Sequence, residues 1–209
     1  MLIQIYGVTT AEDASAVAEL GPDHVGVVVD EGIDTWDSVD EATARTIIAK
    51  LRGLKVVALS LSTDPARITR TVEIVEPQIL HLARAAGNLS AEMLAELRRN
   101  LAPIELMVTV PVRGPESLDV ARRLAPSADY LLLDTVDPAS GVIGATGHTH
   151  NWNVSAAIVA AVDVPVFLAG GLGPHNVAEA IERVRPAGVD SETRTSRDED
   201  RRRKDPEKV

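Results

Sequence analysis

The 209-residue sequence predicts a single (β/α)8 TIM-barrel domain that spans residues 1–209. Eight short apolar runs rich in β-branched residues recur along the chain, and segments with helical spacing separate them. The length also suits one barrel of about 200 to 250 residues. Strict alternation of strands and helices requires parallel strands joined by crossovers, and eight such units close into a barrel.

The predicted strands are runs in which Val, Ile and Leu dominate. A parallel strand that is covered on both faces is apolar throughout, and these runs are continuous rather than alternating. They occupy residues 2–8, 24–30, 55–62, 79–83, 104–112, 130–135, 164–170 and 187–191.

Between the strands, apolar residues recur three and four positions apart, and Ser, Thr, Asp, Asn or Gly-Pro stand near the segment starts. This pattern predicts amphipathic helices with capped N-termini. The segments are TAEDASAVAELG, SVDEATARTIIAKL, DPARITRTVEIVE, SAEMLAELRRNL, GPESLDVARRLA, NVSAAIVAAV and GPHNVAEAIERVR. The final SRDEDRRRKDPEKV mixes charges of both signs and predicts a solvated last helix, with a partner-binding tail as the alternative.

An open doubly wound sheet would also alternate strands and helices. No GxGxxG follows the first strand, and eight regular units exceed what such a sheet needs, so the barrel is preferred. In a barrel, side chains at the C-terminal ends of the strands converge on one active-site mouth. The residues at those ends are Tyr6, Asp30, Ser60 or Ser62, His81, Thr109, Asp134, Gly170, Gly171, Ser191, Glu192 and Thr193.

Composition narrows the class of function. A net charge of -10 disfavours a nucleic-acid partner, which requires a basic face. The absence of cysteine excludes disulfides and thiol nucleophiles, and the N-terminus shows neither a signal peptide nor a membrane span. We therefore expect a cytoplasmic monomer or homodimer that acts on a small molecule and has no nucleic-acid or membrane partner.

Several segments resemble, in the same order along the chain, phosphoribosylanthranilate isomerase of tryptophan biosynthesis. IQIYGVTT is similar to the family's first strand, KICG-(I/L)-T, and LLLDT to its LLD. GATGHTHNW is similar to GGTGKTFDW, and VPVFLAGGLGPHNVAEAI to P-x-x-LAGGL-x-P-x-NV-x-x-A. KDPEKV resembles the family's last helix. The resemblance covers nearly the whole chain.

This resemblance implies an Amadori-type isomerisation of an aminoaldose phosphate to an aminoketose phosphate, or a related proton transfer on a small phosphorylated carbohydrate-like substrate. In the family, a carboxylic acid ending the sixth strand protonates the furanose oxygen, and Asp134 stands at that position. A cysteine ending the first strand removes the C2 proton, and Tyr6 stands there instead. A phenol with a pKa near ~10 is a poor base. His81 is a candidate replacement, with a hydrogen-bonded interior histidine as the alternative.

The resemblance also implies which loops hold the substrate and its phosphate. The predicted residues are Gly144, Thr146, Gly147, Gly170, Gly171, Thr193 and Arg194. Gly170 and Gly171 would expose backbone N–H groups at the start of a helix, where the dipole favours an anion, unless they only shape a tight turn. Glu192 stands where the family has small hydroxyl residues, and its charge would repel a phosphate, although Arg194 could offset it.

Two other functions stay open. Asp30, His81 and Asp134 end three strands and could bind a divalent metal in an epimerase, lyase or hydrolase, with His148 or His150 as a fourth ligand. The preferred interpretation uses no cofactor. A non-catalytic ligand-binding paralogue is the third possibility, because the cysteine is missing and Thr35 stands near the family's arginine for the substrate carboxylate.

Overall fold

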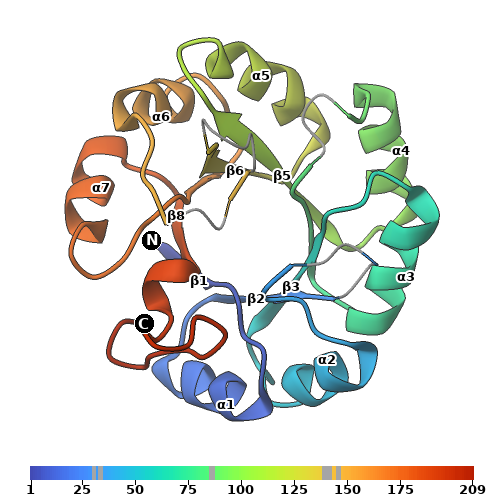
Figure 1. Ribbon diagram of the computed structural model, residues 1–209. Helices are drawn as coiled ribbons and strands as arrows, with labels where there is room; N and C mark the ends of the chain where they lie inside the picture. The colour runs from blue at the N-terminus through green and yellow to red at the C-terminus, as the bar shows by residue number, and fades with distance from the viewer. Residues whose placement is uncertain (30–31, 33–34, 85–87, 138–142, 145–146) are drawn as a thin grey trace.

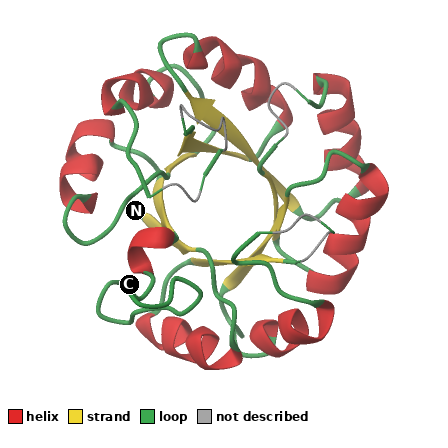
Figure 2. Cartoon of the chain, viewed as in Figure 1, coloured by secondary structure: helices red, strands yellow, loops and turns green. Residues whose placement is uncertain are grey.

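In the computed structural model of the chain, eight parallel strands form a closed barrel in the order β1 to β8 (Figure 1). The structure describes residues 1–29, 32, 35–84, 88–137, 143–144 and 147–209. Helices form a ring around the strands, and loops connect the two layers (Figure 2). The predicted (β/α)8 barrel is confirmed, and the open doubly wound sheet is wrong.

Each of the eight predicted strands is present within a few residues of its expected bounds. The runs 2–8 and 164–170 extend beyond their strands because Gly7 and Gly170 have φ values of 73° and 84°, which end the extended conformation. The strands are β1 (Leu2–Ile5), β2 (His24–Val28), β3 (Lys55–Ser60), β4 (Ile79–Leu82), β5 (Glu105–Val112), β6 (Tyr130–Thr135), β7 (Val166–Leu168) and β8 (Gly188–Ser191).

The helices begin where the sequence places polar caps. The side chains of Thr10, Asp40, Asp64, Ser90 and Asn151 each accept a backbone N–H of the helix that follows. Among the described residues, no helix is long and apolar enough to cross a membrane. The helices are α1 (Ala11–Leu20), α2 (Glu41–Ile48), α3 (Pro65–Val75), α4 (Ala91–Asn100), α5 (Ser117–Leu124), α6 (Trp152–Val159) and α7 (Val177–Val184), with 3-10 turns η1 (Ala125–Ser127) and η2 (Thr193–Thr195).

Bulky side chains fill the barrel interior below the mouth. Met107 and Phe167 have no exposed surface, and the Phe167 ring stacks on His24 with 5.3 Å between centroids. A side chain at Gly188 would collide with the Phe167 ring, so the glycine makes room for this interior residue. The barrel is therefore a packed core, and its open space lies at the C-terminal ends of the strands.

The chain after β8 contradicts the expected last helix. Beyond η2, the described residues form no α-helix; residues 196–209, here called the C-terminal arm, run beside α1 (Figure 1). Arg203 Nε and Nη2 donate to Asp13 at 2.9 and 3.1 Å, and the backbone N–H of Lys204 donates to Asp13 at 3.1 Å. Lys204 is only 1% exposed. Because these charges find acceptors on α1, the arm packs against the barrel instead of forming a solvated helix.

Replacing Asp13 by Ala is expected to release the C-terminal arm. Asp13 is 3% exposed and accepts three hydrogen bonds from the arm, so the free energy of unfolding should fall by about 1.5–3 kcal/mol in urea titrations. Glu12→Ala is the matched control, because Glu12 pairs with the same Arg203 but its side chain is 80% exposed. Its effect should stay below about 1 kcal/mol. Equal losses in the two variants would contradict the anchoring role of Asp13.

Candidate active site

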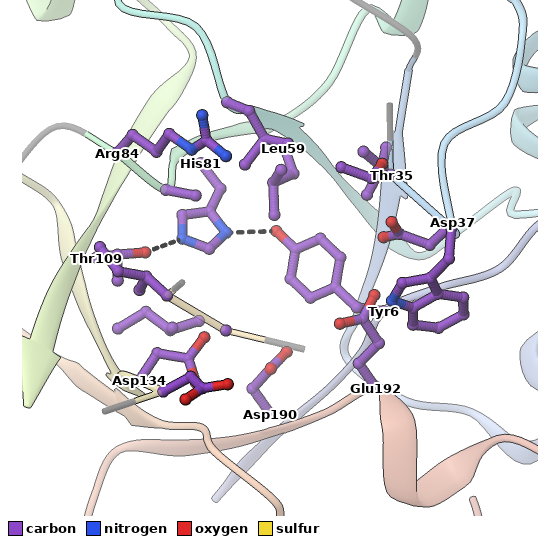
Figure 3. Close-up of a pocket in the computed structure, with 18 of the residues that line it drawn as sticks. Tyr6, Thr35, Asp37, Leu59, His81, Arg84, Thr109, Asp134, Asp190 and Glu192 are labelled. Atoms are coloured by element: carbon purple, nitrogen blue, oxygen red, sulfur yellow. Dashed lines mark hydrogen bonds between the residues drawn. The ribbon is translucent and has the colours of Figure 1, made fainter. Parts of the chain in front are cut away.

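A cavity of about 630 Å³ opens at the C-terminal ends of the strands, which is the size range of small-molecule sites. Figure 3 shows the side chains that line it. Those that the sequence places at the mouth come from five different strands or the loops directly after them. They are Tyr6, His81, Thr109, Asp134 and Glu192.

One wall of the cavity is a hydrogen-bonded chain of three buried side chains. Tyr6 Oη lies 2.7 Å from His81 Nδ1, and His81 Nε2 lies 2.7 Å from Thr109 Oγ1 (Figure 3). The Tyr6 ring packs against Gly26, where any side chain would collide with it. This wall is fixed by partners at both ring nitrogens of His81.

The electrostatics of this wall disfavour a basic role for either residue. Burial lowers the pKa of His81 to about 3. Burial, together with the charges of Asp190 and Glu192, raises the pKa of Tyr6 well above its ordinary value of 10. At neutral pH the imidazole is a weak base and the phenol stays protonated. The geometry therefore favours the alternative of a hydrogen-bonded interior histidine.

Asp134 is the penultimate residue of β6 and faces the same cavity. Its side chain is partly buried, and Oδ1 accepts the backbone N–H of Thr135 at 2.7 Å. Burial raises the pKa of Asp134 to about 7, against the lowering effect of that hydrogen bond. Gly144 lies over the carboxyl group with a φ of 76°, and a Cβ there would come within 2.5 Å of Oδ2. Asp134 can therefore both donate and accept a proton near neutral pH.

A smaller cavity of about 30 Å³ lies between the loops after β7 and β8. It adjoins Asp134 and is lined by five of the predicted phosphate-binding residues: Gly147, Gly170, Gly171, Thr193 and Arg194. Within the described part of the chain, the N–H groups of Gly170, Gly171, Thr193 and Arg194 form no backbone hydrogen bond. The space is large enough for water, and a larger anion requires the surrounding loops to separate.

The structure corrects two details of the predicted phosphate loops, and a third concerns a residue outside the described part of the chain. Gly170 and Gly171 are not at the start of α7, because that helix begins at Val177 and Asn176 Oδ1 already accepts the Gly173 N–H at 2.9 Å. Gly144 lies over Asp134 rather than beside these loops. Thr146 lies outside the described residues.

Arg194 joins the two loops around the smaller cavity. Its Nε and Nη2 donate to the carbonyl oxygen of Gly147 at 3.2 and 2.9 Å. Gly147 belongs to the GATGHTHNW loop, so the guanidinium ties that loop to the one after β8. The Gly171 Cα has no room for a side chain, because a Cβ would lie 2.7 Å from the His148 carbonyl carbon.

The alternative metal site involves residues with other partners. Asp30 lies outside the described residues, and both ring nitrogens of His81 have hydrogen-bond partners. His150 lies 3.1 Å from Thr135 Oγ1 and 2.7 Å from Ser155 Oγ, and burial lowers its pKa to about 4. Among the residues that are described, no group of three His, Asp or Glu side chains could hold a metal ion.

Three charged residues at or beside the mouth are not predicted from the sequence. Asp190, within β8, accepts a hydrogen bond from Gln4 Nε2 at 3.1 Å, and burial raises its pKa to about 8. Asp37 follows β2 and also lines the cavity. Lys204, from the C-terminal arm, donates from Nζ to the Glu192 carbonyl oxygen at 2.8 Å behind the cavity wall. The position of Asp190 within the predicted strand 187–191 could have indicated a place near the mouth. No nearby sequence pattern indicates such a place for Asp37 or Lys204.

Comparisons with known proteins agree with this geometry. Residues 3–196 match the family model described as N-(5'phosphoribosyl)anthranilate (PRA) isomerase. The N-(5'-phosphoribosyl)anthranilate isomerase of Haloferax volcanii is 38% identical and covers 90% of this chain and 81% of its own length. The enzyme of the same name from Methanocella arvoryzae is 36% identical, and the match covers 90% of this chain and 85% of that protein.

A solved structure agrees as well. Monomers generated from the dimeric phosphoribosylanthranilate isomerase of Thermotoga maritima superpose with a TM-score of 0.78 at 25% identity. The match covers 99% of this chain and 94% of that one. The likeness in sequence and in structure therefore extends over almost the whole barrel.

Asp134→Asn is expected to stabilise the fold at about pH 8 and to leave it unchanged near pH 3. The folded-state pKa of about 7 lies above the usual 3.8, so the unfolded chain loses its proton first as the pH rises. The free energy of unfolding of the native chain therefore falls by up to about 4 kcal/mol as the pH rises from about 3.8 to about 7. The Asn variant does not ionise, so its stability does not fall in this way. Urea unfolding at both pH values measures the difference; the same stability change at both would contradict the raised pKa.

Proposed function

The chain belongs to the N-(5'-phosphoribosyl)anthranilate isomerase family, and from this premise we propose that it catalyses an Amadori-type isomerisation of a phosphorylated aminoaldose. It is an isomerase with the barrel of its relatives. The observation that carries the proposal is Asp134, a carboxyl group with a pKa near 7 between the large cavity and the smaller one.

Asp134 is suited to the acid step of this reaction. At neutral pH a substantial fraction of the carboxyl group is protonated, so it can protonate the furanose oxygen while the C1–O bond breaks. The lone pair of the amine nitrogen forms the protonated Schiff base, and the resulting carboxylate can later accept a proton. Gly144 lies close to the carboxyl group, since a Cβ there would come within 2.5 Å of Oδ2.

The backbone groups around the smaller cavity favour a phosphate site next to this acid. Two turns, Gly170–Gly171 after β7 and Thr193–Arg194 after β8, offer backbone N–H groups that have no backbone partner within the described residues. Oriented N–H groups at such turns bind anions, and barrels of this class commonly hold phosphate after their last two strands. Binding requires the Arg194 contact with Gly147 to open or shift.

The reaction moves protons within one molecule and requires no cofactor. The amine substituent of the substrate is the part that the family resemblance leaves open, because Thr35 stands near the position of the arginine for its carboxylate. N-(5'-phosphoribosyl)anthranilate, after which the relatives are named, is the first substrate to assay, followed by phosphoribosylamines with other substituents. If the chain turns over none of these substrates, the proposal is contradicted.

Asp134→Asn should lower kcat about 10²- to 10⁴-fold with little change in KM, because the amide retains the shape but cannot donate the acid proton. Steady-state assays on the substrate that the native chain turns over measure the effect. Asp119→Asn on α5 is the matched control, since its side chain is 81% exposed, and it should keep the native rate. A native rate in Asp134→Asn would rule out this carboxyl group as the acid.

A further inference from the structure

The isomerisation also requires a group that removes the C2 proton, and neither Tyr6 nor His81 is suited to that step. Glu192, directly after β8, lies on the same cavity wall. A Cβ on Gly7 would stand 3.1 Å from Glu192 Cγ and 3.3 Å from Oε1. The Glu192 side chain therefore reaches the end of β1, and Glu192 also lines the smaller cavity. Figure 3 shows it beside Tyr6, with Asp190 between it and Asp134.

A second carboxyl group lies near that of Glu192. The side chain of Asp37, in the loop after β2, is 8% exposed and lines the same cavity as Glu192 (Figure 3). Adjacent like charges disfavour double ionisation, and burial together with Asp37 raises the pKa of Glu192. Glu192 and Asp37, here called the carboxyl pair, therefore lie together at the edge of the cavity.

Lys204 holds the backbone of Glu192 in place from the C-terminal arm. Its Nζ donates to the Glu192 carbonyl oxygen at 2.8 Å and to Ser196 Oγ at 3.1 Å. The same Nζ would stand 3.2 Å from a Cβ on Gly7, so the ammonium and the Glu192 carboxyl group lie against one glycine. The C-terminal arm therefore places a buried positive charge next to the carboxyl pair.

We propose that the Glu192–Asp37 carboxyl pair is the second acid–base group of the isomerisation, and that Lys204 is its positioning residue. The inference rests on the proposed function, for which Asp134 is the acid. Glu192 and Asp37 both line the cavity that Asp134 faces, so one substrate can contact all three.

The pair completes the proton transfers of the reaction. The C2–H bond of the protonated Schiff base breaks, and its proton passes to the ionised member of the pair. The electron pair of that bond forms the C1=C2 bond of an enolamine, while the C=N electrons return to nitrogen. The pair then gives a proton to C1, and the enol hydroxyl proton passes to the Asp134 carboxylate as the C2 carbonyl forms.

The surroundings of Glu192 determine the pH dependence. Asp37 from the loop after β2, Asp190 from β8, Tyr6 after β1 and Lys204 from the arm face it. Burial and Asp37 raise the pKa of Glu192, and the Lys204 ammonium opposes that rise. Loss of the ammonium should raise the pKa of Glu192 further, because its carboxylate loses a neighbouring positive charge.

Glu192→Gln and Lys204→Met test the two roles through kcat, KM and the pH–rate profile. Glu192→Gln keeps the size and polarity of the side chain but cannot accept the C2 proton, so kcat should fall about 10²- to 10⁴-fold with little change in KM. Lys204→Met should move the acidic limb of the profile to higher pH. Asp37→Asn should lower kcat as Glu192→Gln does. Circular dichroism on each variant verifies the fold.

Glu182→Gln on α7 is the matched control, because Glu182 is exposed and the charge change is the same. It should keep the native kcat and pH profile. A native rate in Glu192→Gln or Asp37→Asn, with Asp134→Asn inactive, would overturn the inference and leave the proposed function intact. An unshifted acidic limb in a folded Lys204→Met would overturn the positioning role. A native chain that turns over no aminoaldose phosphate would instead overturn the proposed function.

Discussion

The pairing of β1 with β8 is the constraint on which the rest of the structure depends. Residues Leu2 to Ile5 align with Gly188 to Ser191 in a parallel register, which closes the sheet into a barrel. Closure also brings the residues after the first strand next to those after the last one. Tyr6 and Gly7 thereby meet Glu192, although they lie at opposite ends of the sequence. The mouth exists as one cavity because of this contact.

The mouth has two walls of different chemistry. The wall after β1, β4 and β5 is an uncharged chain of Tyr6, His81 and Thr109, whose hydrogen bonds fix its shape. The wall after β6 and β8 and the loop after β2 carries carboxyl groups with raised pKa values, among them Asp134 and Asp190. Burial of several carboxyl groups in one cavity is unfavourable for folding, and it is also what allows them to exchange protons near neutral pH.

The C-terminal arm offsets part of this unfavourable charge. In a chain with a net charge of -10, Lys204 is a nearly fully buried cation, and it lies beside the carboxyl wall. Asp13 on α1 anchors the arm, so the position of the ammonium depends on the helix that follows β1. The arm thus occupies the place of a last helix and also provides a charge to the site.

The sequence by itself determined the barrel, because the periods that distinguish strands from helices are local properties of a few residues. It also placed Asp134 and His81 at the mouth, since both stand at or near the ends of apolar runs. Only the tertiary structure decided that His81 is held between Tyr6 and Thr109, and that Glu192 reaches the end of β1 and lines the same cavity as Asp37. A charge-rich C-terminus has the same composition whether it forms a solvated helix or packs as an arm. The acceptor that decides between them, Asp13, lies far away in the sequence and becomes a neighbour only when the barrel closes.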